Sequence, residues 1–168
     1  RLGENLALGL VQRQTEEALR ESEHLFRQLF EQAAIGIFIS SAEHTIIEVN
    51  QTALSILGYS REELLQMGAR DLLHPDDILE NSLQAVMEKM LSGESVDMER
   101  RFRTKQGTYI HVLVNMAKLP YYSEEASHMV MFQDISDRKQ MEERLREMSL
   151  YDSLTGLYNR NFFEAEME

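Results

Sequence analysis

Residues 46–64, which read IIEVNQTALSILGYSREEL, contain a change of hydrophobic period that decides the fold. The β-branched residues at its start predict a strand over 45–49. A short helix follows over 50–58, where Gly58 supplies a left-handed C-terminal cap. Ser60 then begins a second helix with a capping box, since a Glu stands three residues later. The stretch therefore predicts one strand that leads directly into two short helices.

Regular elements on both sides of this stretch predict an α+β domain. A strand over 35–40 precedes it, joined by the polar turn SAEH, which lacks the usual Asn-Gly or Asp-Gly pair. A longer helix over 78–91 follows, with one apolar face and one polar face. Three further strands are predicted over 96–104, 109–118 and 128–133. Five strands, with helices between the second and third, predict one antiparallel sheet with one face buried under the helices.

The sequence predicts a helix on each side of this domain, over residues 1–30 and 137–150. In the first, small or apolar residues alternate by three and four positions, which is the spacing of a coiled-coil seam. The residues of this seam are Leu8, Val11, Ala18, Leu25 and Leu29, with Thr15 and Ser22 weakening it. The second helix carries a shorter seam of Met141, Leu145 and Met148. We expect a homodimer through these helices, and the alternative is that the first helix lies on its own domain.

The composition narrows the class of function. The 168 residues carry a net charge of −12, which argues against binding to nucleic acid or to an anionic membrane surface. The chain has no cysteine, which excludes disulfides, thiolate metal sites and cysteinyl-flavin chemistry. The longest apolar run near the start, residues 6–11, is far shorter than the roughly 20 residues that span a bilayer. We expect a cytoplasmic segment without membrane contact of its own, whose parent protein has room for a membrane anchor upstream.

Five motifs resemble, in order and spacing, the PAS family of sensory domains. They are ESEHLFRQLFEQAAIGIFI (21–39), IIEVNQTALSILGYSREEL (46–64), LLHPDD (72–77), KQGTYIHV (105–112) and MVMFQDISDRKQ (129–140). One departure is the first hairpin turn, where PAS sequences often carry Asp-Gly and this chain has Glu43-His44-Thr45. The resemblance implies the PAS fold, a five-stranded antiparallel sheet with helices on one face and signalling helices at both ends.

A last motif, DSLTGLYNRNFFE (152–164), is similar to the opening of the GGDEF domain of diguanylate cyclases. In that family the GTP-binding and metal-binding residues lie further on, so no catalytic residue is expected in this chain. The two resemblances together imply four parts: an N-terminal signalling helix (1–30), a PAS sensory domain (31–136), a linker helix (137–150) and the truncated start of a GGDEF domain (151–168).

The predicted interior is rich in methionine, whose flexible side chain fits irregular space. The PAS resemblance places the long helix and the last three strands around a cavity, where a small apolar ligand can bind. The pocket candidates are Asn50, Met87, Met90, Met98, Val112, Val114, Met116, Met129 and Met131. Ordinary core packing is the alternative for the methionines. Asn50 also matches a common PAS asparagine, whose usual role is a structural hydrogen bond.

No cofactor or metal is predicted. Haem-binding PAS domains carry the axial His on the long helix, and residues 78–91 contain none. A covalent flavin adduct needs a cysteine. His111 and His128 can face each other on neighbouring strands, but no obvious third ligand accompanies them, and solvated strand histidines are the simpler interpretation.

The residues between the last strand and the C-terminal helix form a predicted relay junction. They are Asp134, Ile135, Ser136, Asp137 and Arg138. Ser136 or Asp134 can cap the helix, and Asp137 is favourable in its first turn. The PAS resemblance implies that a stimulus alters the sheet and re-aims this helix, which controls how two GGDEF domains meet to make cyclic di-GMP. The alternatives are a dimerisation module without a ligand, and relay to a degenerate GGDEF or phosphodiesterase output.

Overall fold

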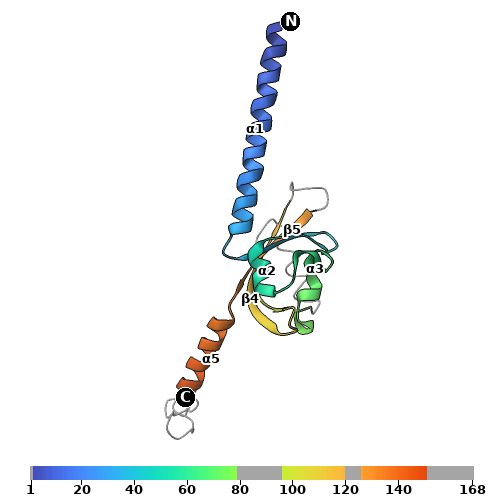
Figure 1. Ribbon diagram of the computed structural model, residues 1–168. Coiled ribbons are helices and arrows are strands. Elements are labelled where there is room, and N and C mark those ends of the chain that lie inside the picture. Colours follow the sequence, from blue (N-terminus) through green and yellow to red (C-terminus); the bar gives the residue numbers. More distant parts are fainter. Residues whose placement is uncertain (1, 79–95, 120–125, 151–168) are drawn as a thin grey trace.

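The computed structural model describes residues 2–78, 96–119 and 126–150 (Figure 1). Five strands form one antiparallel sheet in the order β2-β1-β5-β4-β3. The strands are β1 Gly36–Ser41, β2 Ile46–Val49, β3 Val96–Arg103, β4 Tyr109–Lys118 and β5 Ala126–Asp134. The helices are α1 Leu2–Gln32, α2 Gln51–Leu57, α3 Arg61–Leu65 and α5 Ser136–Leu150, with the short 3-10 helices η1 Ala69–Leu72 and η2 Pro75–Ile78. The predicted α+β class with a five-stranded antiparallel sheet is confirmed.

The predicted strands and helices agree with these bounds to within two residues at each end. The predicted long helix over 78–91 falls largely outside the described residues. The predicted start of a GGDEF domain over 151–168 lies wholly outside them.

The face of the sheet that carries α2 and α3, which we call the inner face, holds the main core. Phe38, Phe102 and Phe132 meet at its centre, with ring centroids 5.2 to 6.5 Å apart. Leu57 from α2 and Leu64 from α3 pack into the same cluster. Phe38 lies on β1, Phe102 on β3 and Phe132 on β5. Alternate residues of a strand point to the same face, and in all three strands the Phe is one of the residues that point to the inner face.

The opposite face of β1 and β5, which we call the outer face, is covered by the end of α1. Phe30 is the buried residue of α1, and it clusters with Ile37 and Ile39 of β1. Met129 and Met131 of β5 pack against this second cluster. Both faces of β1 and β5 are therefore covered, the outer face of β5 only in part.

The turn between β1 and β2 shows how the chain closes a hairpin without the Asp-Gly pair. His44 has a φ of 68°, in the left-handed region that is uncommon outside glycine. Ser41 stabilises the turn, because its Oγ accepts hydrogen bonds from the N–H groups of Glu43 (3.2 Å) and Thr45 (3.3 Å). The turn brings the His44 ring beside β5, where it stacks on His128 with centroids 6.1 Å apart.

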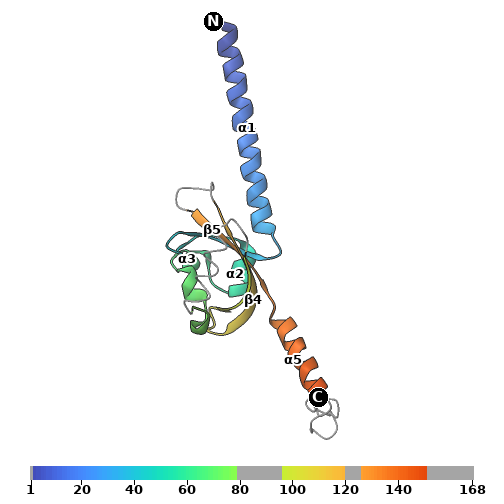
Figure 2. The same cartoon turned by 180° about the vertical axis from the view of Figure 1, so that it is seen from behind.

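The two flanking helices leave the sheet at the same end of two neighbouring strands. Gly36, at the start of β1, pairs with Phe132 near the end of β5. In both views α1 runs away from the sheet in one direction and α5 in the other (Figures 1 and 2). With 31 residues, α1 is about 46 Å long, so most of it projects beyond the domain.

Candidate functional site

A cavity of about 80 Å³ lies under the inner face of the sheet, beside η1. Most of its wall is apolar, formed by Phe38, Ala69, Leu73, Met98, Phe102, Val114, Met116 and Val130. The rest is polar and basic, formed by Ser40, His44, Arg70, Arg100 and His128. No acidic residue lines the cavity within the described part of the chain.

Three of the predicted pocket residues line this cavity, namely Met98, Val114 and Met116. Strand pairing explains why, since Met98 lies opposite Val114, and Met116 is two residues further along the same face of β4. Val112 shares that face and is fully buried, but it belongs to the main core and not to the cavity wall.

Two of the predicted pocket residues lie on the wrong side of the sheet. Met129 and Met131 alternate with the inner residues Val130 and Phe132, so they point to the outer face and pack near Phe30. Their assignment to the pocket is corrected accordingly. Two other candidates, Met87 and Met90, lie outside the described residues.

Asn50 is a structural hub. It is fully buried, and its Oδ1 accepts hydrogen bonds from the N–H groups of Ile37 and Ala53, both at 2.9 Å. Its Nδ2 donates to the carbonyl oxygens of Phe30 (2.9 Å) and Ile35 (3.0 Å). An amide offers two acceptor and two donor positions, and all four are used inside the protein. None is left for a ligand, which corrects the placement of Asn50 in the pocket and leaves it the structural role.

The polar end of the cavity joins side chains from three elements that are distant in sequence. His128 of β5 lies opposite Ser40 of β1 in the strand register and stacks on His44. The Arg70 guanidinium of η1 is 3.2 Å from Nε2 of His44, and because a guanidinium only donates, Nε2 is the acceptor. We call Ser40, His44, Arg70 and His128 the basic end of the cavity. Arg100 lines the cavity from β3 and lies further along the sheet, opposite Val112.

Both histidines of the basic end have lowered pKa values. Burial lowers the pKa of His128, and the charge of Lys118 lowers it further, against a hydrogen bond of the ring to the Ser41 backbone. Burial also lowers the pKa of His44, assisted by the charges of Arg70 and His128 and opposed by Glu43. Both rings are therefore neutral near pH 7 in the unliganded protein.

One polar atom at the basic end has no partner. The Nδ1 atom of His128 is buried and makes no hydrogen bond within the described part of the chain. A buried polar atom without a partner costs free energy, so its position next to a cavity points to an occupant that can bond to it. Sequence alternation offered one signal for this site, since His128, Val130 and Phe132 share a strand face. No sequence signal linked that face to His44 or Arg70.

His111 and His128 are not opposite each other in the sheet. His111 and His128 lie far apart along β4 and β5, because His128 pairs with Lys118 while His111 comes just before Val112, the partner of Asp134. The suggestion that the two face each other is corrected by this register. Residues 2–78, 96–119 and 126–150 contain no cluster of three or more His, Asp or Glu side chains that could hold a metal ion.

The predicted relay junction is bonded directly to β4. The Ile135 N–H donates to the carbonyl of His111 at 2.8 Å, and the N–H of His111 donates to Oγ of Ser136 at 3.1 Å. Asp134 accepts from the N–H of Ser136 at 2.8 Å, which satisfies one free donor at the start of α5. Ile135 is buried, so the junction is packed as well as bonded.

The first turn of α5 is also tied to β3. Glu99 pairs with Arg138 at 3.0 Å and with Nζ of Lys139. A hydrogen bond from Lys139, followed by the charges of Lys139 and Arg138, lowers the pKa of Glu99. Asp137 lies in the first turn of α5, where a negative charge is favourable.

The seam residues of the two flanking helices are all exposed. On α1 these are Leu8, Val11, Ala18, Leu25 and Leu29, and on α5 they are Met141, Leu145 and Met148. The alternative in which α1 lies on its own domain does not hold, because only Phe30 of this helix is buried.

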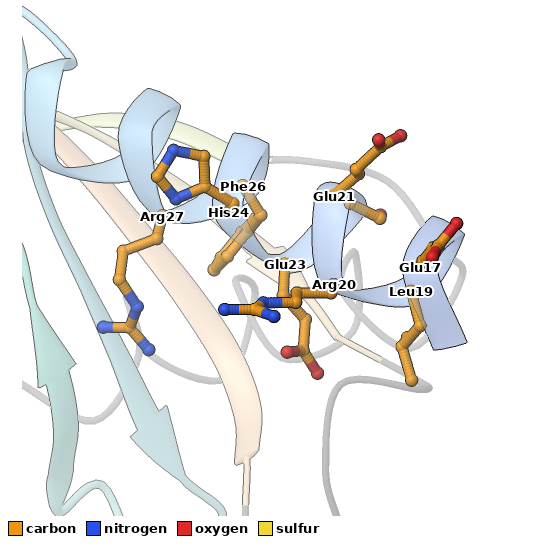
Figure 3. Close-up of a pocket in the computed structure, with 9 residues that line it drawn as sticks. Glu17, Leu19, Arg20, Glu21, Glu23, His24, Phe26 and Arg27 are labelled. Carbon is orange, nitrogen blue, oxygen red and sulfur yellow. The ribbon is translucent and has the colours of Figure 1, made fainter. Parts of the chain in front are cut away.

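Two hollows follow the surface of α1. The larger, about 1280 Å³, is lined by residues of this helix alone, between Glu17 and Arg27. Figure 3 shows that the labelled side chains fan out from successive turns and do not converge on one point. A space bounded by one exposed helix does not enclose a small molecule, so these residues are not a candidate ligand site.

No helix among the described residues combines the length and the apolar character needed to cross a membrane.

Comparison with known proteins identifies the architecture. The family profile described as "PAS fold" matches residues 24–135. Among solved structures, a domain of the sensory box sensor histidine kinase/response regulator from Geobacter sulfurreducens aligns with a TM-score of 0.57 and 28% identity. The alignment covers 69% of this chain and 96% of that one.

Two curated relatives, one named as a probable diguanylate cyclase and one as a kinase, are much longer than this chain. "Probable diguanylate cyclase DgcE" of Escherichia coli strain K12 is 30% identical over 128 residues, covering 74% of this chain and 11% of that protein. "Sporulation kinase E" of Bacillus subtilis strain 168 is 30% identical over 135 residues, covering 78% of this chain and 17% of that protein. The chain thus spans less than a fifth of the length of either relative.

Proposed function

The chain belongs to the PAS fold family, as its motifs predicted, and on this premise we propose that it is a sensory module that relays a signal through its flanking helices to an output domain. The observation that carries the proposal is the attachment of α5 to β3 and β4. The same two strands wall the cavity with Met98, Val114 and Met116 on their inner face. A ligand that displaces either strand therefore displaces the bonds of Glu99 and His111 that hold the start of α5.

The output we propose is a downstream GGDEF domain that makes cyclic di-GMP. Two observations support it: the similarity of residues 152–164 to the start of such domains, and the relative named as a probable diguanylate cyclase. On this proposal the segment itself is not catalytic and lies in the cytoplasm, where GTP is found. The kinase relative supports a second output of the same signalling type, and the residues that follow Glu168 in the parent protein distinguish the two.

The partner we propose for the flanking helices is a second copy of the chain. The seam on α1 extends from Leu8 to Leu29 at alternating steps of three and four, which is the repeat of a two-stranded coiled coil. A helix about 46 Å long with so little burial of its own needs a partner, since isolated helices gain most of their stability from packing of an apolar face.

A ligand-free dimerisation module is the second candidate. The observation in its favour is the small volume of the cavity, about 80 Å³, since most small-molecule sites are several times larger. Under this candidate the inner face is only a core, and signals arrive through α1.

The two candidates differ in what disturbs the output of the parent protein. We would measure cyclic di-GMP synthesis by the intact protein with Glu99→Gln, which cuts the tie between β3 and α5 but leaves the dimer seam untouched. The sensory proposal expects the basal rate to change by about ten-fold or more in either direction, because α5 is re-aimed. Asp97→Asn is the matched control, since Asp97 lies on the same strand and bonds only to Asn115 among the described residues. An unchanged rate in Glu99→Gln, together with a changed rate in seam variants, would favour the dimerisation module.

A further inference from the structure

The basic end of the cavity carries positive charge that no carboxylate neutralises. Arg61, Arg101 and Arg138 each pair with at least one Glu or Asp. Arg70 makes no such pair within residues 2–78, 96–119 and 126–150, and its one hydrogen bond goes to the neutral ring of His44. Arg70 also lines the cavity, so its guanidinium leaves a site for an anion there.

The buried Nδ1 of His128 adds a second, independent feature that points to a ligand. The ring has a hydrogen bond to the Ser41 backbone while Nδ1 has no partner, so we assign the proton of the neutral ring to the other nitrogen, which makes Nδ1 a bare acceptor. When the ring gains a proton, Nδ1 becomes a donor directed at whatever lies beside it. The His128 ring stacks on His44 from the β1–β2 turn, and the charge of Lys118 from β4 acts on it. His44 in turn bonds to Arg70 from η1, and the charge of Glu43 acts on His44.

The remainder of the cavity is apolar and small. Next to Ser40 and His128 along the sheet come Phe38 and Val130, followed by Met116 on β4. The volume of about 80 Å³ is roughly half that of a cavity that admits benzene, about 150 Å³, so an occupant has about three to five non-hydrogen atoms beyond any bound water. A charged group at one end and a short alkyl chain at the other fit these two parts.

We propose that this cavity binds a short aliphatic monocarboxylate, with the carboxylate at Arg70 and His128 and the alkyl chain against Phe38, Val130 and Met116. The proton that His128 needs in order to donate to the carboxylate comes from solvent, so one proton is taken up for each anion bound. The ligand would be the stimulus of the sensory module, and in that respect the inference rests on the proposed function. Binding itself does not require that function.

The direct test is calorimetry and thermal unfolding of this chain with sodium propionate. We expect a Kd of about 1 mM or tighter and a rise in Tm. Propionamide is the neutral isostere, and we expect it to bind at least about ten-fold more weakly, because a charge-assisted bond is replaced by a neutral one. Sodium chloride and sodium phosphate at equal ionic strength separate a carboxylate site from a general anion site.

Two variants localise the site. Arg70→Gln and His128→Gln are each expected to weaken propionate binding by at least about ten-fold. Arg103→Gln, an exposed arginine at the end of β3, is the matched control and is expected to leave binding unchanged. Calorimetry near about pH 7.5 in buffers of different ionisation enthalpy measures the proton uptake, expected to be close to one for the wild type and near zero for His128→Gln.

Several results would overturn the inference. These are the absence of propionate binding, equal binding of propionamide or chloride, an unchanged affinity in both variants, and no proton uptake. Failure of the sensory proposal looks different: propionate binds as expected, but the cyclic di-GMP output of the parent protein does not respond to it. Conversely, an output that responds to Glu99→Gln with no propionate binding leaves the sensory function standing and removes this ligand.

Discussion

Gly36 lies directly opposite Phe132 in the β1–β5 ladder, and the Phe132 ring occupies the space that a side chain at Gly36 would need. A Cβ atom on Gly36 would stand 2.3 Å from Cζ of Phe132, well inside contact distance. The ring is itself held by Phe38 and Phe102, so it has no free space to move into. The absence of a side chain at Gly36 therefore allows the Phe132 ring to pack against the first residue of β1.

Gly36→Ala is expected to destabilise the domain by about 1 to 3 kcal/mol, the usual cost of overpacking a core. Thermal or urea unfolding would measure the change. Gly3→Ala on α1 is the control, since nothing lies within 4 Å of the added Cβ there and no loss is expected. Adding Phe132→Leu to Gly36→Ala should remove most of the extra penalty, because the two residues are in contact. Simple additivity of the two losses would argue against the clash.

Asn50→Ala is expected to cost about 3 kcal/mol or more, since three buried backbone groups and one partly buried group lose their partner at once. The same change at Asn115, whose amide bonds to Asp97 at the surface, should stay within about 0.5 kcal/mol. Urea unfolding of both variants provides the comparison. A small loss at Asn50 would mean that water replaces the amide in this hub.

Val11→Glu combined with Leu25→Glu is expected to shift the chain from dimer to monomer, because charges in a coiled-coil seam must be desolvated or the helices must part. Sedimentation velocity reports the mass, and circular dichroism reports whether the domain stays folded. Leu10 provides a strict control, since it is exposed to the same extent as Val11, 59%, but lies outside the seam. Leu10→Glu with His24→Glu should therefore leave the dimer intact. Dissociation by the control pair alone would place the interface on another side of α1.

The ion pairs of Glu99 with Arg138 and Lys139 are expected to weaken as the pH falls. The pKa of Glu99 in the folded protein is lowered from 4.5, so its contribution is fully present above that value and is lost as the pH falls through the lower, folded value. Hydrogen exchange of the first amides of α5 should thus be insensitive to Glu99→Gln under strongly acidic conditions and faster in the variant near neutral pH, after correction for the intrinsic rates. Equal exchange at neutral pH would indicate that the bonds from His111 suffice to hold the helix.

The elements of the fold were predictable because each has a clear period in the sequence, two for the strands and three to four for the helices. The pocket was only half predictable, for a physical reason. On β5 both faces carry apolar residues, so Met129 and Met131 look as suitable for an interior as Val130 and Phe132 do, and alternation alone does not say which face holds the cavity. The basic end was beyond sequence reasoning, since His44, Arg70 and His128 meet only after the chain folds.

The adjacency of β1 and β5 has an evolutionary consequence. The chain enters the domain at β1 and leaves it at the neighbouring strand β5. The whole domain therefore lies to one side of the path from α1 to α5, and the two helices point away from it in opposite directions (Figure 2). Such a unit can be duplicated, removed or exchanged between genes without rerouting the polypeptide on either side of it. At each junction with a flanking helix, the number of residues only has to keep the coiled-coil seams in phase. Insertions or deletions of seven residues, or multiples of seven, in α1 or α5 should therefore be tolerated better than other lengths.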